Sequence, residues 1–477
     1  MELLFVASEV APWSKTGGLG DVAAALPRAL AARGHDVTVV TPRDGGVDAP
    51  AHGFTRVERP PLVRGQPTGL WVRREPGRPE VVLVEHERYF GARHGVYGDG
   101  RREYGDNAER FAHLCRAALA VPAALGRRPR VVHGNDWPTG LLPWLVRHEH
   151  AQDAALAGAR TVFTIHNLAY QGVFPKQVLP FIGLPWDVFH LEAMEFYDQV
   201  SFMKAGLSFA DALTTVSPSY AREILTPEEG AGLDPLLRHR RAALHGILNG
   251  IDVIEWDPAR DPHLPVHYSA RDLVGKGACK ASLQREVGLP VRPDVPLLAM
   301  ISRLADQKGV DLVLAALPQI VAREAQLVVL GSGSHAYEEA FRSAAAAHPR
   351  QVAARIGFDE GLAHRIEAGA DVFLMPSRYE PCGLNQMYSL RYGTVPVVRA
   401  VGGLEDTVED YDGWSRGTGF KFREYAPQAL WLALRRALEL WRDQRAWRAL
   451  VLRGMAQDLS WDRSARGYEA LYRTLAG

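Results

Sequence analysis

The chain has 477 residues, a length that normally corresponds to two domains. With 47% apolar and 23% charged residues, its composition is that of an ordinary soluble globular protein. The formal net charge at pH 7 is zero, whereas a nucleic-acid-binding protein normally carries a basic surplus. We therefore expect no nucleic-acid partner.

The cysteines and the hydropathy pattern indicate the kind of protein and its compartment more closely. Cys115, Cys279 and Cys382 are scattered and odd in number, which argues against a disulfide framework and fits a reducing compartment. Neither C-x-x-C nor H-E-x-x-H occurs, so we expect no metal site and no cofactor. The first five residues are typical of a strand and lack the basic segment of a signal peptide. Because no apolar run approaches the roughly 20 residues that span a bilayer, we expect a cytoplasmic protein without a membrane partner.

The first half of the chain begins with a βαβ pattern. An apolar run at 3–7 is followed by a glycine-rich loop, an Ala/Leu-rich helical segment at 22–33 and a β-branched strand at 37–40. Between 45 and 79 the chain is rich in Gly, Pro and Arg, which predicts irregular or hairpin-like structure. Further strands are expected at 81–84, 131–132, 161–165 and 212–216.

The second half alternates strands and helices more regularly. Strands are expected at 297–301, 327–330, 352–358, 371–375 and 395–398, and helices at 310–323, 335–347, 360–368 and 385–392. Such alternation predicts parallel sheets with both faces covered. In the last segment Tyr468, Leu471, Tyr472 and Leu475 are spaced as on one face of a helix.

The boundary between two such domains is expected near 248–252, before a Pro/Asp/His-rich stretch at 256–268. Doubly wound sheets bind ligands at the carboxyl ends of their strands. We therefore expect the active site in a cleft between the domains, built from loops that follow strands.

The first such loop contains Lys15, Gly17, Gly18, Gly20 and Asp21 and opens a helix. Glycines let backbone amides approach an anion, and a helix N-terminus favours negative charge. A tight turn with a solvated Lys15 is an equally good interpretation of the loop alone. The pattern is neither G-x-G-x-x-G nor G-x-x-x-x-G-K-[ST], which argues against a dehydrogenase and a nucleoside triphosphatase.

Two loops of the second half also carry polar groups between a strand and a helix. Arg303 and Lys308 suit a diphosphate, although exposed Arg and Lys are more often plain surface cations. Glu380 suits sugar hydroxyls, or it caps the following helix. Gly383 lets the backbone approach a ligand, and the Cys382 thiol is best interpreted as a small packed group. We expect Lys308 to face solvent, so that its truncation changes stability little.

Loops after two strands of the first half contain Asp136, His166 and Asn167. All three can hydrogen-bond sugar hydroxyls. A single histidine is more often structural, but this one follows a strand of a sheet whose other loops are also polar.

Five segments taken together resemble the bacterial glycogen synthases and plant starch synthases. They are K-T-G-G-L-G-D at 15–21, T-I-H-N-L-A-Y-Q-G at 164–172, L-N-G-I-D at 248–252, S-R-L-A-D-Q-K-G at 302–309 and S-R-Y-E-P-C-G-L-N-Q at 377–386. The resemblance extends from Met1 to about Thr407. It implies the GT-B fold, with two Rossmann-like α/β domains facing a central cleft, and a retaining transfer of glucose from ADP-glucose or UDP-glucose to glycogen or a maltooligosaccharide. It also implies an acceptor-side domain at 1–247, joined by a terminal helix at 459–477, and a donor-side domain at 248–458.

The resemblance also implies roles for individual residues. Lys15, Arg303 and Lys308 would face the donor's phosphates, and Glu380, Asp136, His166 and Asn167 would surround the glucosyl group. Phe358 would stack on the nucleobase. The other implied substrate-binding residues are Gly17, Gly18, Asp21, Asn249, Cys382, Gly383 and Leu384. Tyr388 stands where other retaining transferases have the second acid of an E-x(7)-E pattern, as is usual in this family.

Two other functions are compatible with the same fold. One is a GT-B transferase that makes sucrose, trehalose or a lipid-linked glycan, and the acceptor sugar distinguishes it. The other is a non-catalytic glucan-binding protein, against which the complete set of charged loop residues argues.

Overall fold

The computed structural model describes residues 1–100 and 102–477. The chain forms two compact units. The first, unit 1, comprises Met1–Asn249 and Trp461–Gly477, and the second, unit 2, comprises Gly250–Ser460. Among the described residues, no helix has both the length and the apolar character needed to cross a membrane.

A nine-stranded sheet forms the centre of unit 1, in the order β14-β13-β9-β8-β1-β2-β7-β6-β3. β1 pairs in parallel with β2 on one side and β8 on the other, and β6 pairs antiparallel with β7. The chain therefore adds strands first on one side of β1 and later on the other, and the β1/β8 junction is a topological switch point. The strands are β1 (Glu2–Val6), β2 (Asp36–Pro42), β3 (Thr55–Arg56), β6 (Gly69–Arg73), β7 (Glu80–Glu85), β8 (Val131–Asn135), β9 (Arg160–Ile165), β13 (Ala212–Thr215) and β14 (Leu244–Gly246).

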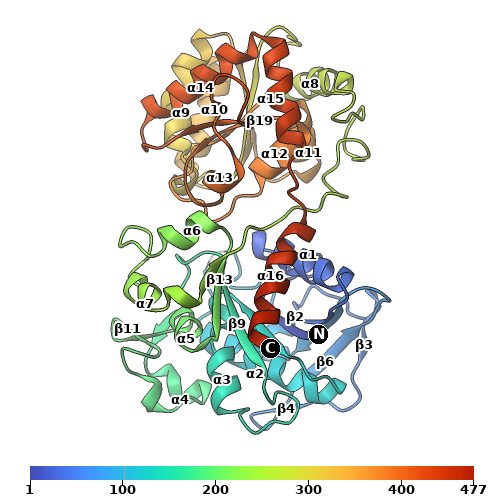
Figure 1. The fold of residues 1–477 in the computed structure, drawn as a ribbon, viewed down its shortest axis with the longest axis vertical. Coiled ribbons are helices and arrows are strands. Elements are labelled where there is room, and N and C mark those ends of the chain that lie inside the picture. The colour runs from blue at the N-terminus through green and yellow to red at the C-terminus, as the bar shows by residue number, and fades with distance from the viewer. Residues whose placement is uncertain (101) are drawn as a thin grey trace. The chain divides into compact units, whose positions relative to one another are not determined.

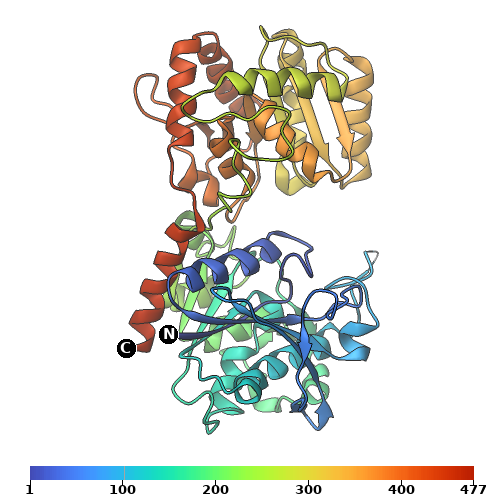
Figure 2. The same cartoon turned by 90° about the vertical axis from the view of Figure 1, so that its right-hand side faces the viewer.

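Helices cover both faces of this sheet, as Figure 2 shows with α1 in blue on one face and the cyan and green helices on the other. The helices of unit 1 are α1 (Gly18–Ala32), α2 (Asn107–Leu125), α3 (Leu142–His148), α4 (Val178–Ile182), α5 (Phe202–Phe209), α6 (Pro218–Glu223), α7 (Asp234–His239) and α16 (Trp461–Ala476). Smaller sheets join β4 (Leu62–Val63) to β5 (Gln66–Pro67), and β10 (Val173–Pro175) to β12 (Gln199–Ser201) and β11 (Glu195–Phe196).

The last helix, α16, packs beside α1 (Figure 1). Its Tyr468 and Tyr472 are fully buried in the cluster that also contains Phe5 of β1. The Tyr472 hydroxyl lies 2.6 Å from Nδ1 of the buried His133, and Arg33, which directly follows α1, forms an ion pair with Glu469 at 2.7 Å. The predicted amphipathic helix at the end of the chain therefore exists, and its apolar face completes the core of unit 1.

Unit 2 contains a parallel six-stranded sheet in the order β17-β16-β15-β18-β19-β20. Counted along the chain this is the order 3-2-1-4-5-6 of the doubly wound fold, with the switch point between β15 and β18. The strands are β15 (Leu297–Ile301), β16 (Gln326–Gly331), β17 (Val352–Ile356), β18 (Val372–Met375), β19 (Val395–Arg399) and β20 (Phe420–Phe422).

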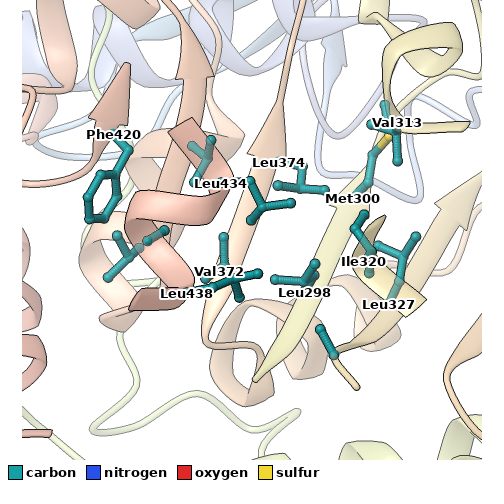
Figure 3. Packing of buried hydrophobic residues seen from close by; sticks show 14 of the residues in the cluster. Leu298, Met300, Val313, Ile320, Leu327, Val372, Leu374, Phe420, Leu434 and Leu438 are labelled. Carbon is teal, nitrogen blue, oxygen red and sulfur yellow. The ribbon is translucent and has the colours of Figure 1, made fainter. Parts of the chain in front are cut away.

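The two faces of this sheet bury alternate residues of each strand. Leu298 and Met300 of β15 lie in one cluster with Leu434 of α14 (Figure 3), whereas Leu297 and Ala299 lie in a separate cluster. Successive side chains of a strand point to opposite faces, so a strand covered on both sides is apolar throughout. The helices are α8 (Val274–Val287), α9 (Val310–Ala322), α10 (His335–Ala347), α11 (Glu360–Gly369), α12 (Asn385–Tyr392), α13 (Gly402–Thr407), α14 (Pro427–Trp441) and α15 (Gln444–Met455).

Candidate functional site

Two loops of unit 2 lie together at the switch point of its sheet. The loop at 302–309 follows β15, and the loop at 376–384 follows β18, which pairs directly with β15. This is the position at which doubly wound sheets bind ligands. The two loops carry most of the residues of unit 2 that the sequence indicates for the site.

Lys308 and Glu380 form an ion pair between these loops. The Nζ of Lys308 lies 2.6 Å from Oε2 of Glu380, and the Ser377 hydroxyl donates to the same oxygen at 3.0 Å. The Glu380 side chain is only 8% exposed and that of Lys308 23%. The expectation of a solvent-facing Lys308 is therefore wrong, because its ammonium neutralises a buried carboxylate. Glu380 does not cap α12 either, since that helix begins at Asn385 without a side-chain cap.

Backbone contacts join the loop at 302–309 to the loop at 376–384. The Arg378 N–H donates to the carbonyl of Gln307 at 2.7 Å. Gly309 has φ of 68°, and a Cβ at this position would lie 2.1 Å from the carbonyl oxygen of Pro376. Only glycine fits both the left-handed conformation and this close approach. The close packing of Gly309 against Pro376 therefore holds the backbone beside Lys308 in place.

The segment containing Cys382, Gly383 and Leu384 leads into α12. Cys382 is buried, Gly383 has φ of 70°, and Leu384 is the residue that precedes the helix. Nε2 of Gln386 donates to the carbonyls of Cys382 and Gly383, each at 3.0 Å. The Cys382 thiol is a packed group, as its sequence context indicates, and the segment's shape is set by Gln386.

Arg303 and Phe358 lie in loops that follow β15 and β17, and both are exposed. Phe358 is 85% exposed, an unusual state for a phenyl ring and one that leaves its face open to a planar ligand. β17 ends at Ile356, two residues earlier than the sequence predicts, because Gly357 turns the chain with φ of 137°.

In unit 1 the glycine-rich loop after β1 is held by an acidic side chain of its own chain. The amides of Thr16 and Gly17 donate to Oε2 of Glu9 at 2.5 and 3.0 Å. The Tyr97 hydroxyl donates to the other oxygen of Glu9 at 2.9 Å. In this structure the Gly17 amide is therefore satisfied by the Glu9 carboxylate.

Lys15, Gly18 and Asp21 adjoin this loop. Nζ of Lys15 lies 2.8 Å from Oδ1 of Asp21, and the two side chains are 46% and 36% exposed. Gly18 is the first residue of α1, and Asp21 lies in its first turn, where a negative charge is favourable.

Asp136, His166 and Asn167 come together at the ends of β8 and β9. The amides of His166 and Asn167 donate to Oδ1 of Asp136 at 2.7 and 3.4 Å. Asp136 has a positive φ of 56°, which turns the chain sharply at the end of β8. Burial raises the pKa of Asp136 from 3.8 to about 7, although the two amide donors act in the opposite direction.

The imidazole of His166 is neutral near pH 7, because burial lowers its pKa to about 3. Its Nε2 lies 2.9 Å from Oδ1 of Asn135, an oxygen that can only accept, so Nε2 carries the proton. Oδ1 of Asn167 accepts from the Ala169 amide at 3.0 Å, which fixes the orientation of that side chain.

Asn249 is the last residue of the first segment of unit 1 and is buried. Within the described part of the chain, its Oδ1 has no hydrogen-bond partner.

Sequence reasoning missed the residues that orient these groups: Glu9, Tyr97, Asn135 and Ser377. Ser377 is the first residue of the quoted segment at 377–386 and Asn135 directly precedes Asp136, so both could have been included. Tyr97 lies 88 residues from Glu9, and no spacing rule connects them.

Comparisons with known proteins show the family. Residues 2–239 match the family described as starch synthase catalytic domain, and residues 286–449 match glycosyl transferases group 1. A glycogen synthase of Anaeromyxobacter dehalogenans (strain 2CP-1 / ATCC BAA-258) is 72% identical over 476 residues, covering 100% of this chain and 99% of that protein. The chain belongs to the glycogen and starch synthase family. A glycogen synthase of Myxococcus xanthus (strain DK1622) is 52% identical, covering 100% of this chain and 99% of that protein.

Solved structures agree with this membership. The catalytic domain of starch synthase IV from Arabidopsis thaliana, bound to ADP and acarbose, superposes with a TM-score of 0.89 at 34% identity, covering 100% of this chain and 99% of that one. Sucrose-phosphate synthase from Thermosynechococcus elongatus superposes with a TM-score of 0.63 at 18% identity, covering 99% and 98%, and shares the fold. The enzyme is a glycosyltransferase of the starch and glycogen synthase type, and its fold is GT-B.

Proposed function

We propose that the enzyme transfers glucose from ADP-glucose, and more weakly from UDP-glucose, to the non-reducing end of an α-1,4-glucan with retention of configuration. The observation that carries this proposal is the Lys308–Glu380 pair at the switch point of unit 2. The Arabidopsis starch synthase, 34% identical over the whole chain, is bound to ADP and acarbose, a nucleotide and a glucan-like ligand. The same two classes of ligand are therefore assigned to this enzyme.

Unit 2 is assigned to the donor. Lys308 and the exposed Arg303 follow β15 and would hold the diphosphate, and the exposed ring of Phe358 would stack on the nucleobase. Glu380 orients the Lys308 ammonium and hydrogen-bonds a sugar hydroxyl. Cys382, Gly383 and Leu384 offer backbone groups to the same sugar.

The reaction needs charge stabilisation on the leaving group more than it needs a nucleophile. As the bond between the sugar and the diphosphate breaks, negative charge grows on the phosphate, and a fixed cation binds it most strongly at that point. We propose that the acceptor hydroxyl attacks from the same face and gives its proton to the departing phosphate. This course retains the configuration without a covalent intermediate.

Unit 1 is assigned mainly to the glucan. Asp136, His166 and Asn167 would bind sugar hydroxyls, with Asn249 in a supporting position, and the backbone carbonyl of His166 would stabilise positive charge on the transferred sugar. Lys15, Gly17, Gly18 and Asp21 would lie near the phosphates. The three cysteines are all buried and none is in a disulfide bond, which fits the cytoplasm as the site of this reaction.

The test is glucosyl transfer to glycogen by the purified chain, with radiolabelled ADP-glucose and UDP-glucose compared in parallel. We expect incorporation with both donors, faster with ADP-glucose, and proton NMR of the new linkage should show the α anomer. A β product, or incorporation from neither donor, would refute the proposal. Transfer to a monosaccharide phosphate in place of the glucan would assign the enzyme to another GT-B activity.

A further inference from the structure

A stack of three aromatic rings lies in unit 2 near the beginning of α12. The indole of Trp256 lies between the imidazole of His364 in α11 and the phenol ring of Tyr388 in α12. Its ring centroid is 3.8 Å from the first and 3.7 Å from the second, and the planes differ by 13° and 12°. The two helices are neighbours in the fold (Figure 1). One side chain from the segment that opens unit 2 therefore contacts both of them.

We propose that Trp256 is a positioning residue for the donor side of the site. By stacking on Tyr388 it holds the first turn of α12, and with that turn the backbone of Cys382, Gly383 and Leu384. The inference rests on the proposed function, in which this backbone binds the donor's sugar. Trp256 itself touches no substrate, and its effect passes through α12.

Tyr388 is joined by hydrogen bonds to the residues that precede α12. Its amide donates to the carbonyl of Leu384 at 3.0 Å, and the Met387 amide donates to the same carbonyl at 2.8 Å. Nδ2 of Asn385 donates to the carbonyl of Ile301, the last residue of β15, at 2.8 Å. A shift of the Tyr388 ring would therefore move the backbone groups immediately before α12.

The backbone beside the indole is attached to the same helix. Nε of Arg391 donates to the carbonyl of Trp256 at 3.3 Å, and its Nη2 lies 3.2 Å from Oδ1 of Asp257. The Tyr392 hydroxyl donates to Oδ2 of the buried Asp261 at 2.6 Å. Arg391 and Tyr392 lie three and four positions after the stacked tyrosine and so share its face of the helix. That face of α12 therefore lies against the segment that contains the indole.

The opposite side of the indole is also held in place. Nδ1 of His364 lies 2.8 Å from Oδ2 of Asp261, and both residues are buried. The ring of Tyr392 meets the indole at 72°, with centroids 6.0 Å apart. A side chain contacted by three rings has few accessible rotamers, so it can hold the ring of Tyr388 with little further loss of conformational entropy.

Plain core packing is the competing explanation, and a second tryptophan distinguishes it from positioning. Trp256 and Trp431 of α14 are both partly buried, and both pack against the same core cluster. The Trp431 ring lies 5.9 Å from Cζ of Arg323, which directly follows α9. Because α9 begins just after Gly309 and has 13 residues, about 20 Å of helix separates Arg323 from Lys308. Trp431 is therefore a matched residue remote from the site.

The experiment compares Trp256→Leu, Trp256→Phe and Trp431→Leu in the full chain by steady-state kinetics and melting temperature. We expect Trp256→Leu to lower kcat/KM for ADP-glucose by roughly 10- to 100-fold, because a misplacement of about 1 Å has effects of this size. The KM for ADP-glucose should rise while that for glycogen stays constant, a change that a smaller fraction of folded enzyme does not produce. Trp256→Phe keeps a ring for the stack and should restore most of the activity. Trp431→Leu should also melt at a lower temperature, with unchanged kcat/KM.

Tyr388→Leu removes the other ring and tests the same contact even where Trp256→Leu folds poorly. The double variant Trp256→Leu with Tyr388→Leu should lose no more kcat/KM than Tyr388→Leu alone, because Trp256 acts through that ring. Losses that multiply in the double variant would overturn the proposal. Equal kinetics of Trp256→Leu and Trp431→Leu would overturn it as well, since both tryptophans would then only pack.

Failure of this inference is distinguishable from failure of the proposed function. Absence of glucosyl transfer by the unmodified chain would refute the proposed function, and the positioning role with it. A normal kcat/KM and donor KM in Trp256→Leu, beside an active unmodified chain, would refute the positioning role alone.

Discussion

At the scale of single residues, the position of Lys308 against Glu380 decides what each can do. A lysine ammonium on a flexible stem is a poorly placed charge unless something holds it. The Ser377 hydroxyl holds the Glu380 carboxylate in place, and that carboxylate holds the Lys308 ammonium at 2.6 Å. The pair therefore presents an oriented cation at the end of β15, where a diphosphate would bind.

Replacement of Lys308 by Ala should lower both activity and stability. We expect kcat to fall by roughly 10²–10³-fold, by analogy with the loss of one donor to a developing anion. Because Glu380 is buried and would lose its counter-charge, we also expect a loss of about 1–3 kcal/mol in the free energy of unfolding. Steady-state kinetics and urea denaturation measure the two effects separately.

The double variant Lys308→Met with Glu380→Gln is the control, since it removes both charges together. It should recover part of the stability and none of the activity.

Arg303→Lys should be impaired as well, because an ammonium cannot make the forked contact of a guanidinium with phosphate. A near-normal kcat for Lys308→Ala would show that this lysine only neutralises Glu380.

Asp136 should make stability depend on pH. Its folded-state pKa of about 7 lies above the ordinary 3.8, so the folded protein retains a proton that the unfolded chain has lost between those values. Stability from this group therefore falls as the pH rises from about 4 to 7, and the loss is complete above pH 7. Asp136→Asn keeps an oxygen for the amides of His166 and Asn167 and has no such dependence.

We expect Asp136→Asn to be more stable than the unmodified enzyme at pH 8, with the difference vanishing near pH 4. Melting temperatures across this range check the prediction, and Asp21→Asn, an exposed aspartate of the same unit, serves as the control. A difference that does not vary with pH would contradict it.

The motifs predict which loops carry the polar residues, but not how those residues pair. Lys308 and Glu380 are 72 residues apart, and only the adjacency of β15 and β18 brings them together. The hydrogen bonds from the Thr16 and Gly17 amides to Glu9 could not be predicted either. A glycine-rich loop has the same sequence pattern whether its amides bind a ligand anion or a side-chain carboxylate.

At the scale of elements, prediction succeeded where a strand or helix has a clear pattern. α10 and α12 begin and end at the predicted residues, and β15 does so too, because each is bounded by turn residues. α2 was not predicted, because 14 of its 19 residues are buried and it lacks a polar face. α14 was also missed, although Leu430, Leu434 and Leu438 repeat at helical spacing.

The glycine before α9 offers a test of how elements position the site. Gly309→Ala forces a side chain into a left-handed conformation and places its Cβ against the Pro376 carbonyl. The first effect alone costs about 1–2 kcal/mol. We expect a larger loss of stability than that, together with a lower kcat, because Lys308 is displaced.

Gly288→Ala is the matched control for this prediction. Gly288 ends α8 with φ of 84°, and a Cβ there meets no atom within 4 Å. It should lose only the stability due to strain and keep its activity. Equal kinetic effects of the two substitutions would show that the close contact at Gly309 does not position Lys308.

At the scale of the whole molecule, both units place their polar residues in the same topological position. The Asp136 and His166 loops follow β8 and β9, beside the β1/β8 switch point, and the Lys308 and Glu380 loops flank the β15/β18 switch point. The alternation of strands and helices predicts two such sheets. It does not predict the order of strands within each, because that order depends on which crossovers are made, and the family resemblance supplied the GT-B arrangement.

The last prediction concerns the role of metal in the whole enzyme. In the proposed function Arg303 and Lys308 would supply the positive charge that a divalent cation supplies in many other phosphate-transferring sites, so glucosyl transfer should not require one. After exhaustive chelation we expect an unchanged kcat with ADP-glucose. The control is the same assay after Mg²⁺ or Mn²⁺ is returned. A loss of kcat on chelation that either ion restores would contradict the charge assignment to Arg303 and Lys308.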